Sequence, residues 1–317
     1  MISKADLFQT NQIMVKSSIL ITGGSGLVGT QLTELLLAKG YSVSHLSRKE
    51  DLSGIVKKYK WDPTSKSIEN KAFENVDHII HLAGAGIADK RWADKRKREI
   101  IDSRVESTRL LFNALKTNKN IVKSIVSASA IGYYGFSKGG NTFTENSESG
   151  SDFLAAVTKD WEKEVDQFEK LNIRVVKLRI GVVLTNKGGA LPQMVLPIKF
   201  FAGSPLGSGG QIVSWIDMVD LCNLFVFGIE NENMNGAYNA VAPNPVSNKQ
   251  LTKAIAKVLH RPVWPVNVPE FMLKLILGEM EVVVTGSCNV ENKRIKEETD
   301  FMYIYTGVEE SLKHNLQ

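Results

Sequence analysis

The chain alternates short apolar runs with longer segments in which apolar residues recur every three or four positions. The short runs have the length of buried strands, and the longer segments have the spacing of amphipathic helices. The predicted strands cover residues 19–21, 41–46, 58–61, 76–82, 121–126 and 174–184. The predicted helices between them include residues 27–36, 101–115 and 152–168. Strands and helices that alternate in this way predict a parallel sheet with helices on both faces.

Glycines follow the first predicted strand with the spacing G-x-x-G-x-x-G, at Gly23, Gly26 and Gly29. In a dinucleotide-binding turn the first glycine allows the tight turn, the second admits the pyrophosphate and the third lets the helix pack on the strand. The following helix directs its free N–H groups and its positive dipole end at the anion. A glycine-rich turn in another strand–helix unit is the alternative, but the flanking strand and helix favour nucleotide binding.

The second predicted strand leads into Ser47, Arg48 and Lys49, with no carboxylate at its end. An Asp or Glu at this place binds the ribose 2′-hydroxyl of NAD, whereas an Arg accommodates the 2′-phosphate of NADP. The planar fork of a guanidinium suits a phosphate, and a neighbouring lysine adds charge. Glu50 and Asp51 offset part of that charge, so a solvated turn is the alternative. We predict NADP(H), with NAD less favoured.

Other residues at the carboxyl ends of the predicted strands complete the expected cofactor site. Small residues after the strand at 76–82 leave room for a cofactor, and Gly181 would allow close approach of the nicotinamide ring. The further cofactor candidates are Thr22, Ser25, Leu27, Val28, Leu82, Ala83, Gly84, Ser127, Ala128 and Arg179.

The pattern changes after residue 185, where short helices and a glycine- and serine-rich segment replace the regular alternation. We therefore expect an α/β protein with a doubly wound parallel Rossmann sheet and a smaller, mostly helical C-terminal substrate lobe. The sheet domain would comprise residues 15–185 and 211–243, the lobe residues 186–210 and 244–317, and an N-terminal extension residues 1–14.

Composition narrows the setting. With 43% apolar and 23% charged residues, the chain is typical of globular proteins, and no apolar run approaches the ~20 residues that span a bilayer. Residues 1–14 lack the apolar core of a signal peptide. Two cysteines form no disulfide framework, which favours a cytoplasmic protein. We expect no membrane partner.

The net charge is +5, but the only dense basic run, residues 90–98, is interleaved with Asp89, Asp94 and Glu99, and the chain lacks the aromatic interleaving of a nucleic-acid platform. It is interpreted mainly as a solvated helix face, and we expect a small-molecule substrate and no nucleic acid. His78 and His81 lie three apart, on opposite faces of a strand, so we expect no metal site. They are expected to be buried and hydrogen-bonded.

Several ordered motifs together resemble the atypical extended short-chain dehydrogenase/reductases, and within them the "epimerase family protein" subfamily with a C-terminal domain of unassigned function. The motifs are TGGSGLVG, HLAGAGIADKRW, SASAIGYYG, DFLAAVTKDWE, LRIGVVL, GGALPQM, LGSGGQIVSWIDMVD, APNPVSN and, at the start of the last domain, LILGEMEVVV. The resemblance runs from Ser18 to the C-terminus. It implies a Rossmann domain that binds NADP and a smaller substrate lobe.

Ordinary members of that family use a Ser, a Tyr and a Lys four residues after the Tyr for acid–base chemistry beside a hydride carrier. Ser129 matches the family serine. A Tyr-x-x-x-Lys occurs as Tyr134 and Lys138, but in the loop directly after the strand. Tyr133 and Tyr134, assisted by Ser129, are the candidates for a rearranged acid.

The helix that carries the family Tyr and Lys has Phe153 and Val157 instead. Phenylalanine has no proton to transfer and valine has no charge. Three interpretations remain: an NADP(H)-dependent oxidoreductase or epimerase-like enzyme with a non-standard acid, a catalytically impaired NADP(H)-binding sensor or regulatory protein, and a nucleotide-sugar epimerase or dehydratase. The last needs the Tyr/Lys pair and is the weakest.

Candidate substrate residues follow two loops. Lys90, Arg91 and Trp92 come after the strand at 76–82, and Gln211 and Trp215 follow the glycine-rich segment. The alternative for Lys90 and Arg91 is a helix start with charged side chains in solvent. The alternative for Trp215 is a position in the core. Arg104 on the long helix could pair with a carboxylate. The fold also allows a homodimer that pairs through its long helices.

Overall fold

The computed structural model describes residues 16–136 and 141–317. The predicted N-terminal extension and Lys138 lie outside the described residues. Within them, no helix is both long and apolar enough to cross a bilayer.

The centre of the molecule is an eight-stranded sheet with the strand order β12-β8-β6-β5-β1-β2-β3-β4. Every pair of neighbouring strands is parallel except β3 and β4. The strands are β1 (Ser18–Thr22), β2 (Ser42–Ser47), β3 (Lys57–Asp62), β4 (Ser67–Ile68), β5 (His78–His81), β6 (Ser124–Ala130), β8 (Arg174–Ile180) and β12 (Gly236–Ala240). The strand order reverses between β1 and β5, which is where ligands bind in open α/β sheets.

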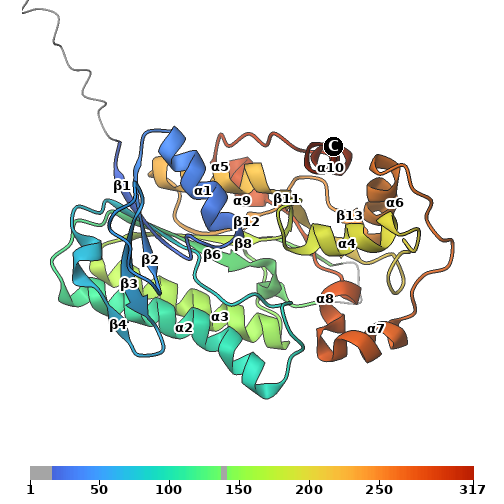
Figure 1. Cartoon of the computed structure of the whole chain (residues 1–317), viewed down its shortest axis with the longest axis horizontal. Coiled ribbons are helices and arrows are strands. Elements are labelled where there is room, and N and C mark those ends of the chain that lie inside the picture. The colour runs from blue at the N-terminus through green and yellow to red at the C-terminus, as the bar shows by residue number, and fades with distance from the viewer. Residues whose placement is uncertain (1–15, 137–140) are drawn as a thin grey trace, which may run out of the picture.

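Helices cover both faces of the sheet, as the alternating pattern predicts (Figure 1). On one face α1 (Leu27–Ala38) and α5 (Met218–Glu230) bury Leu32, Leu36 and Leu221 against β1 and β8. On the other face α2 (Asp94–Thr117) and α3 (Phe153–Val165) bury a second set of apolar side chains, Leu111, Leu115, Trp161 and Val165 among them. The doubly wound sheet predicted from the sequence is confirmed.

The register lines up polar residues across the carboxyl edge of the sheet. Thr22 lies beside His81, His81 beside Ser127, and Ser129 beside Arg179. The regular Rossmann spacing therefore brings residues from four strands to one edge of the sheet.

A third core joins α4 (Ala190–Lys199), α6 (Asn248–Val258) and α10 (Val308–Leu316) around Trp215. The remaining strands are β7 (Thr142–Phe143), β9 (Val182–Leu184), β10 (Ile212–Val213), β11 (Trp215–Asp217), β13 (Val246–Ser247) and β14 (Asn289–Val290). The remaining helices are η1 (Asn70–Phe73), η2 (Ile131–Tyr134), η3 (Asp166–Leu171), α7 (Glu270–Leu277), η4 (Gly278–Met280), α8 (Glu281–Thr285) and α9 (Lys293–Glu298).

One predicted strand is interrupted. The strand expected at 174–184 breaks after β8, and residues 212–217 are divided between β10 and β11. At the break, Gly181 lies against Ser214 so closely that an added Cβ would be 2.5 Å from the Ser214 carbonyl oxygen. From there β9 leaves the main sheet and pairs in parallel with β11.

The division into two units stays a prediction. Residues 291–305 were assigned to the lobe, but Ile295 lies in the core beneath the main sheet, with Phe301 and Tyr303 packed against it.

Candidate functional site

The glycine turn lies between β1 and α1 at the point where the strand order reverses. Gly23 has φ +71°, in the left-handed region, and a Cβ added there would be 3.0 Å from the carbonyl carbon of Leu82. Gly26 N–H donates to the Gly23 carbonyl at 3.0 Å, which closes the turn. A Cβ on Gly29 would overlap that same carbonyl oxygen. Larger residues would therefore obstruct the turn at Gly23 and Gly29.

The first turn of α1 is open to a ligand. Gly26 is its N-cap, and among the residues that the structure describes no side chain accepts a hydrogen bond from its first N–H groups. The first turn of α1 contains no acidic residue. Ser25 is exposed and Leu27 and Val28 are half-buried, so the backbone of this turn borders the surface. An uncapped helix end of this kind fits a pyrophosphate, which would accept from the N–H groups and neutralise the helix dipole.

Thr22 and His81 fix the two strands on either side of the switch point. Thr22 Oγ1 lies 2.7 Å from His81 Nδ1 and accepts from the backbone N–H groups of Leu82 and Ala83, both at 3.1 Å. The other His81 nitrogen lies 2.9 Å from Thr108 Oγ1, and full burial lowers the pKa of His81 to about 3. His81 is thus a neutral, hydrogen-bonded core histidine. Thr22 bonds to His81 and to the loop after β5, and so holds β1 and β5 together at the switch point.

Arg48 and Lys49 lie at the carboxyl end of β2, which pairs with β1 on the side opposite to β5. Both side chains are exposed, and neither forms an ion pair with another residue in the described part of the chain. The nearby Asp51 pairs with Lys58 at 3.4 Å. The two cations beside Ser47 therefore remain available to a phosphate, as the NADP prediction requires.

A loop that the sequence assigned to the substrate lobe also reaches the turn. A Cβ on Gly188 or Gly189 would be 3.3 Å from the side chain of Leu27, and Lys187 Nζ donates to Gln31 Oε1 at 2.6 Å. The segment after β9 therefore lies across the start of α1. The glycine pair was the signal in the sequence for such a close approach.

A buried ion pair occupies the expected catalytic edge of β6. Arg179 Nε and Nη2 donate to the two carboxylate oxygens of Glu162 on α3, each at 2.8 Å. Ser129 Oγ donates to Glu162 Oε1 at 2.6 Å. Arg179 is 4% exposed, so its burial does not favour the predicted contact with the cofactor, which stays a prediction. Ser129, also buried, orients the carboxylate and does not present its hydroxyl to a substrate.

Three further cofactor candidates, Ser127, Gly181 and Gly84, form contacts within the protein. Ser127 is buried and donates to the neighbouring Ala128 carbonyl at 2.9 Å. Gly181 permits close approach of Ser214, a part of the protein and not a cofactor ring. Gly84 lies against the guanidinium of Arg104, in the loop that follows β5.

Tyr134 belongs to the same buried network. Its hydroxyl donates to Asn239 Oδ1 at 2.6 Å and accepts from Arg179 Nη1 at 2.9 Å. The side chain is 3% exposed, and burial raises the pKa of Tyr134 to about 12. The prediction that Tyr134 is a proton donor to substrate is therefore not favoured, because its hydroxyl is enclosed and bonded to Asn239 and Arg179.

Tyr133 differs from its neighbour. It is partly exposed in η2, directly after β6, and its ring lies over the guanidinium of Arg179, with 3.5 Å between the guanidinium carbon and the ring centroid. Tyr134 packs against it edge-on at 5.4 Å. A cation beneath the ring and a second ring at its edge fix its plane. Of the three catalytic candidates, Tyr133 alone is partly exposed, whereas Ser129 and Tyr134 are buried.

The place of the family Tyr/Lys pair on α3 is apolar. Phe153 packs edge-on against Trp92 with ring centroids 5.1 Å apart, and Val157 is buried in the same cluster. Met280 and Leu277, from the C-terminal domain, complete it. The substitutions for Tyr and Lys therefore form a core that attaches the C-terminal domain to α3.

The predicted substrate residues divide by burial. Lys90 and Arg91 are exposed, and Arg91 Nη2 donates to the Leu275 carbonyl at 2.6 Å. Trp92 is buried in the apolar cluster, with Nε1 bonded to the Ile87 carbonyl. These contacts attach the segment to the C-terminal domain and to its own loop.

Gln211 and Trp215 lie inside the protein. Trp215 is fully buried, and its Nε1 donates to the Asn244 carbonyl. Gln211 is buried and donates to the carbonyls of Leu206 and Val284. Their assignment as substrate contacts stays a prediction that this geometry does not favour, because both side chains are enclosed and bonded within the protein.

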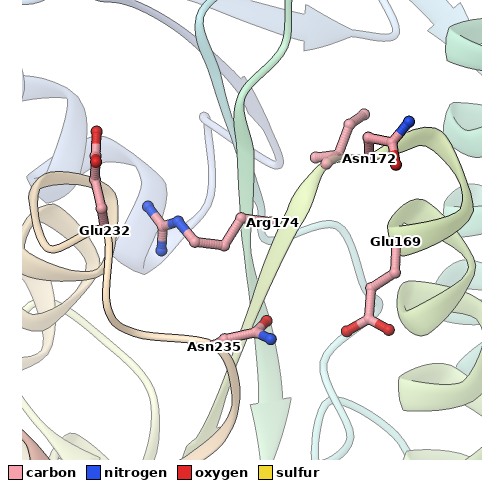
Figure 2. Close-up of a pocket in the computed structure, with 6 residues that line it drawn as sticks. Glu169, Asn172, Arg174, Glu232 and Asn235 are labelled. Atoms are coloured by element: carbon pink, nitrogen blue, oxygen red, sulfur yellow. The ribbon is translucent and has the colours of Figure 1, made fainter.

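A surface hollow lies at the opposite, amino-terminal edge of the sheet. Figure 2 shows Arg174 between Glu232 and Glu169, with Asn235 below it and Asn172 on the side of Glu169. The Arg174 guanidinium donates to the carbonyls of Gly228 and Ile229 at the end of α5. It neutralises the negative helix end, so this hollow has a structural explanation and lies away from the carboxyl edge where ligands bind.

Among the residues that the structure describes, no cluster of His, Cys, Asp and Glu could hold a metal ion. His78, on the outer side of β5, bonds through Nδ1 to Ser124 Oγ at 2.8 Å.

Comparison with known proteins agrees with this geometry. The model of the NAD dependent epimerase/dehydratase family matches residues 19–241, and a domain of unknown function, DUF1731, matches residues 268–314. Epimerase family protein YfhF of Bacillus subtilis is 39% identical over 299 residues, which are 93% of this chain and 96% of that protein. Epimerase family protein SAR0825 of Staphylococcus aureus is 35% identical over 301 residues, 93% and 97% of the two chains.

Solved structures extend the likeness. The crystal structure of human epimerase family protein SDR39U1 with NADPH has a TM-score of 0.83 and 28% identity, covering 94% of this chain and 98% of that one. A nucleoside-diphosphate sugar epimerase from Corynebacterium glutamicum has a TM-score of 0.77 and 31% identity, covering 95% of this chain and 58% of that one. The family model, which covers most of the sheet, and the relatives that align nearly end to end show that the chain belongs to the NAD dependent epimerase/dehydratase family.

Proposed function

We propose that the protein is an NADP(H)-dependent oxidoreductase of the epimerase type, with Tyr133 as the residue that exchanges a proton with the substrate. The observation that carries the proposal is the contrast between Tyr133 and its neighbours. Ser129 and Tyr134 are enclosed in the Arg179 network, whereas Tyr133 lies at the carboxyl edge of β6 with an accessible side chain.

The cofactor part of the proposal rests on the turn and on two cations. The uncapped start of α1 would hold the pyrophosphate, and Arg48 with Lys49 would hold the 2′-phosphate. The human relative solved with NADPH supports NADP(H) for this chain, although distant relatives of the same fold were solved with NAD. When bound, the cofactor supplies the hydride donor or acceptor.

Tyr133 would supply the accompanying proton. Its hydroxyl would donate to, or accept from, a substrate oxygen within hydrogen-bond reach. Arg179 positions the phenol from below, and Glu162 keeps that guanidinium in place. The arrangement replaces a helix-borne Tyr/Lys pair with a loop tyrosine above a buried ion pair.

A catalytically impaired NADP(H) sensor is the second candidate, because Phe153 and Val157 remove the usual acid and its cation from α3. A nucleotide-sugar epimerase is weaker, because that chemistry needs the missing pair. Both cysteines are free and buried, which is compatible with a reducing cytoplasm. A homodimer stays a prediction.

Oxidation of NADPH with a panel of quinones, aldehydes and ketones tests the enzyme against the sensor. We expect turnover with at least one class and a 10²- to 10⁴-fold lower kcat in Tyr133→Phe, about the range that removal of a general acid produces. Unchanged kcat in Tyr133→Phe would refute the assigned acid. NADPH binding without turnover of any panel member would favour the sensor.

A further inference from the structure

Within the described residues, Arg104 on α2 is a cation without a counterion, and it lies against the loop that follows β5. Its Nη1 donates to the carbonyls of Ala85 at 3.0 Å and Ile100 at 3.1 Å. No carboxylate in the described part of the chain pairs with it, contrary to the ion pair that the sequence suggested. Neighbouring arginines differ, since Arg96 pairs with Glu99 at 2.7 Å and Arg109 with Glu164 at 2.6 Å.

The guanidinium is fixed from three sides. A Cβ on Gly84 would be 3.2 Å from its central carbon and 3.3 Å from Nη2, so Nη2 lies against the loop that follows β5. The Trp161 ring on α3 lies 5.2 Å from the same carbon. The two carbonyl bonds hold Nη1. The group is therefore held in place before any ligand arrives, although a surface arginine would normally move freely.

One edge of the guanidinium has no protein partner. Nε and Nη2 donate to no acceptor in the described residues, and the side chain is only half-buried. Because Nε and Nη2 form a planar fork, they match the two oxygens of a carboxylate or a phosphate. The surroundings also withhold solvent: burial lowers the pKa of Arg104 to about 10, and the nearby Arg96 adds repulsion.

The position of Arg104 decides which anion it faces. Leu82 and Ala83, directly before Gly84, lie against Gly23 of the glycine turn, so Arg104 contacts the same loop that packs on the expected cofactor turn. It lies on the β5 side of the switch point, whereas Arg48 lies at the end of β2 on the other side. Under the proposed function the start of α1 would hold the pyrophosphate and Arg48 the 2′-phosphate, so the β5 side would have no cofactor phosphate left to bind.

We infer that Arg104 binds an anionic group of the substrate, a carboxylate or a phosphate, through its Nε and Nη2 fork. The inference deepens the proposed function, and it restricts the substrate class to small molecules that carry such a group near the carbon that reacts. A neutral aldehyde or quinone would leave the fixed cation unpaired.

Anion titrations of the full-length protein saturated with NADP⁺ test the inference without requiring turnover. Benzoate serves as the carboxylate probe and inorganic phosphate as the phosphate probe, at constant ionic strength, with the shift in Tm as the readout. We expect a saturable rise in Tm with at least one probe, and an affinity about tenfold or more lower in Arg104→Met. Arg98→Met, which removes an exposed cation from the same helix, serves as the matched control and should retain the response.

The variants separate the other outcomes. Arg104→Lys keeps the charge and loses the fork, so it should bind the probes more weakly than the wild type and more tightly than Arg104→Met; it also replaces Arg104→Met if that variant fails to fold. A response that is equal in wild type and Arg104→Met would overturn the inference. A tenfold loss of NADPH affinity in Arg104→Met would also overturn it, because the anion would then belong to the cofactor. The same anion titrations of the cofactor-free protein test Arg104 separately from the cofactor. If the protein failed to bind NADPH, the proposed function would be refuted, and the anion titrations would still test the role of Arg104.

Discussion

Arg179 and Glu162 form a two-point ion pair inside the protein, with Nε and Nη2 each 2.8 Å from a carboxylate oxygen. Both side chains are about 5% exposed, so each charge is shielded from water and is compensated by the other. Ser129 and Tyr134 bond to this pair, and Tyr133 stacks on it. One buried ion pair therefore links α3, β8 and the loop that carries the proposed acid.

The first prediction concerns that pair. Glu162→Gln leaves the Arg179 guanidinium buried without a counterion, and we expect the free energy of unfolding to fall by about 3–5 kcal/mol. Urea denaturation followed by circular dichroism measures the change. Glu106→Gln, which removes one partner of a surface pair with Arg109, should change stability by less than about 1 kcal/mol. Equal effects of the two substitutions would contradict the structural role of the buried pair.

The order of strands and helices could be predicted because local periodicity is sufficient for it. The glycine turn was predictable for the same reason, since Gly23, Gly26 and Gly29 are close in sequence and act through the backbone. His81 was correctly expected to be buried and bonded, because an apolar strand flanks it.

The catalytic edge could not be predicted in the same way. Ser129 and Arg179 each bond to Glu162, a residue 33 and 17 positions away, and nothing in the local pattern identifies that partner. A serine at a strand end reads equally well as a catalytic hydroxyl. Gly181 likewise serves a contact with Ser214 that exists only after β9 and β11 have paired.

The second prediction separates the adjacent tyrosines. Tyr134→Phe removes the partner of Asn239 Oδ1 and Arg179 Nη1, and we expect it to destabilise the fold by about 1–3 kcal/mol. Its KM for NADPH should be unchanged. Tyr133→Phe should leave the unfolding free energy nearly unchanged and reduce turnover alone. If the stability loss appeared in Tyr133→Phe and not in Tyr134→Phe, the two roles would have to be exchanged.

The third prediction tests the turn. Gly29→Ala places a methyl group against the Gly23 carbonyl oxygen, which must move the helix away from the strand and alter the pyrophosphate site. We expect NADPH affinity, measured by fluorescence titration, to fall by at least about tenfold. Gly54→Ala is the matched control, since its added Cβ would be 3.6 Å from the nearest atom outside its chain neighbours. Retention of full affinity in Gly29→Ala would exclude the assigned binding mode.

The fourth prediction concerns acid stability. Burial lowers the pKa of His81 to about 3 and of His45 to about 4, so both are neutral in the folded protein. The unfolded chain takes up these protons below about pH 6.5, and the folded chain does so only near pH 3 to 4. Stability is therefore full above pH 6.5 and is lost as the pH falls. Each histidine should account for about 2 kcal/mol of the loss by pH 5.

His81→Asn isolates that contribution, because Asn retains a donor and an acceptor for Thr22 and Thr108 but does not titrate in this range. Its unfolding free energy, measured by urea denaturation between pH 5 and 7, should vary less steeply than that of the wild type. The slope is the deciding quantity, since the substitution also changes the absolute stability. An unchanged slope would show that His81 titrates over the same pH range in the folded and the unfolded chain.

The fifth prediction concerns the choice of cofactor. Arg48→Glu replaces the exposed guanidinium at the end of β2 with a carboxylate, which repels a 2′-phosphate and can accept from a 2′-hydroxyl. We expect NADPH affinity to fall about 10- to 100-fold and NADH affinity to rise or stay level, because a charged hydrogen bond contributes about 1.5–3 kcal/mol. Lys253→Glu, an exposed site on α6, makes the same change in net charge and should leave both affinities unaltered. If the two variants lowered NADPH affinity equally, the effect would reflect overall charge and not recognition by Arg48.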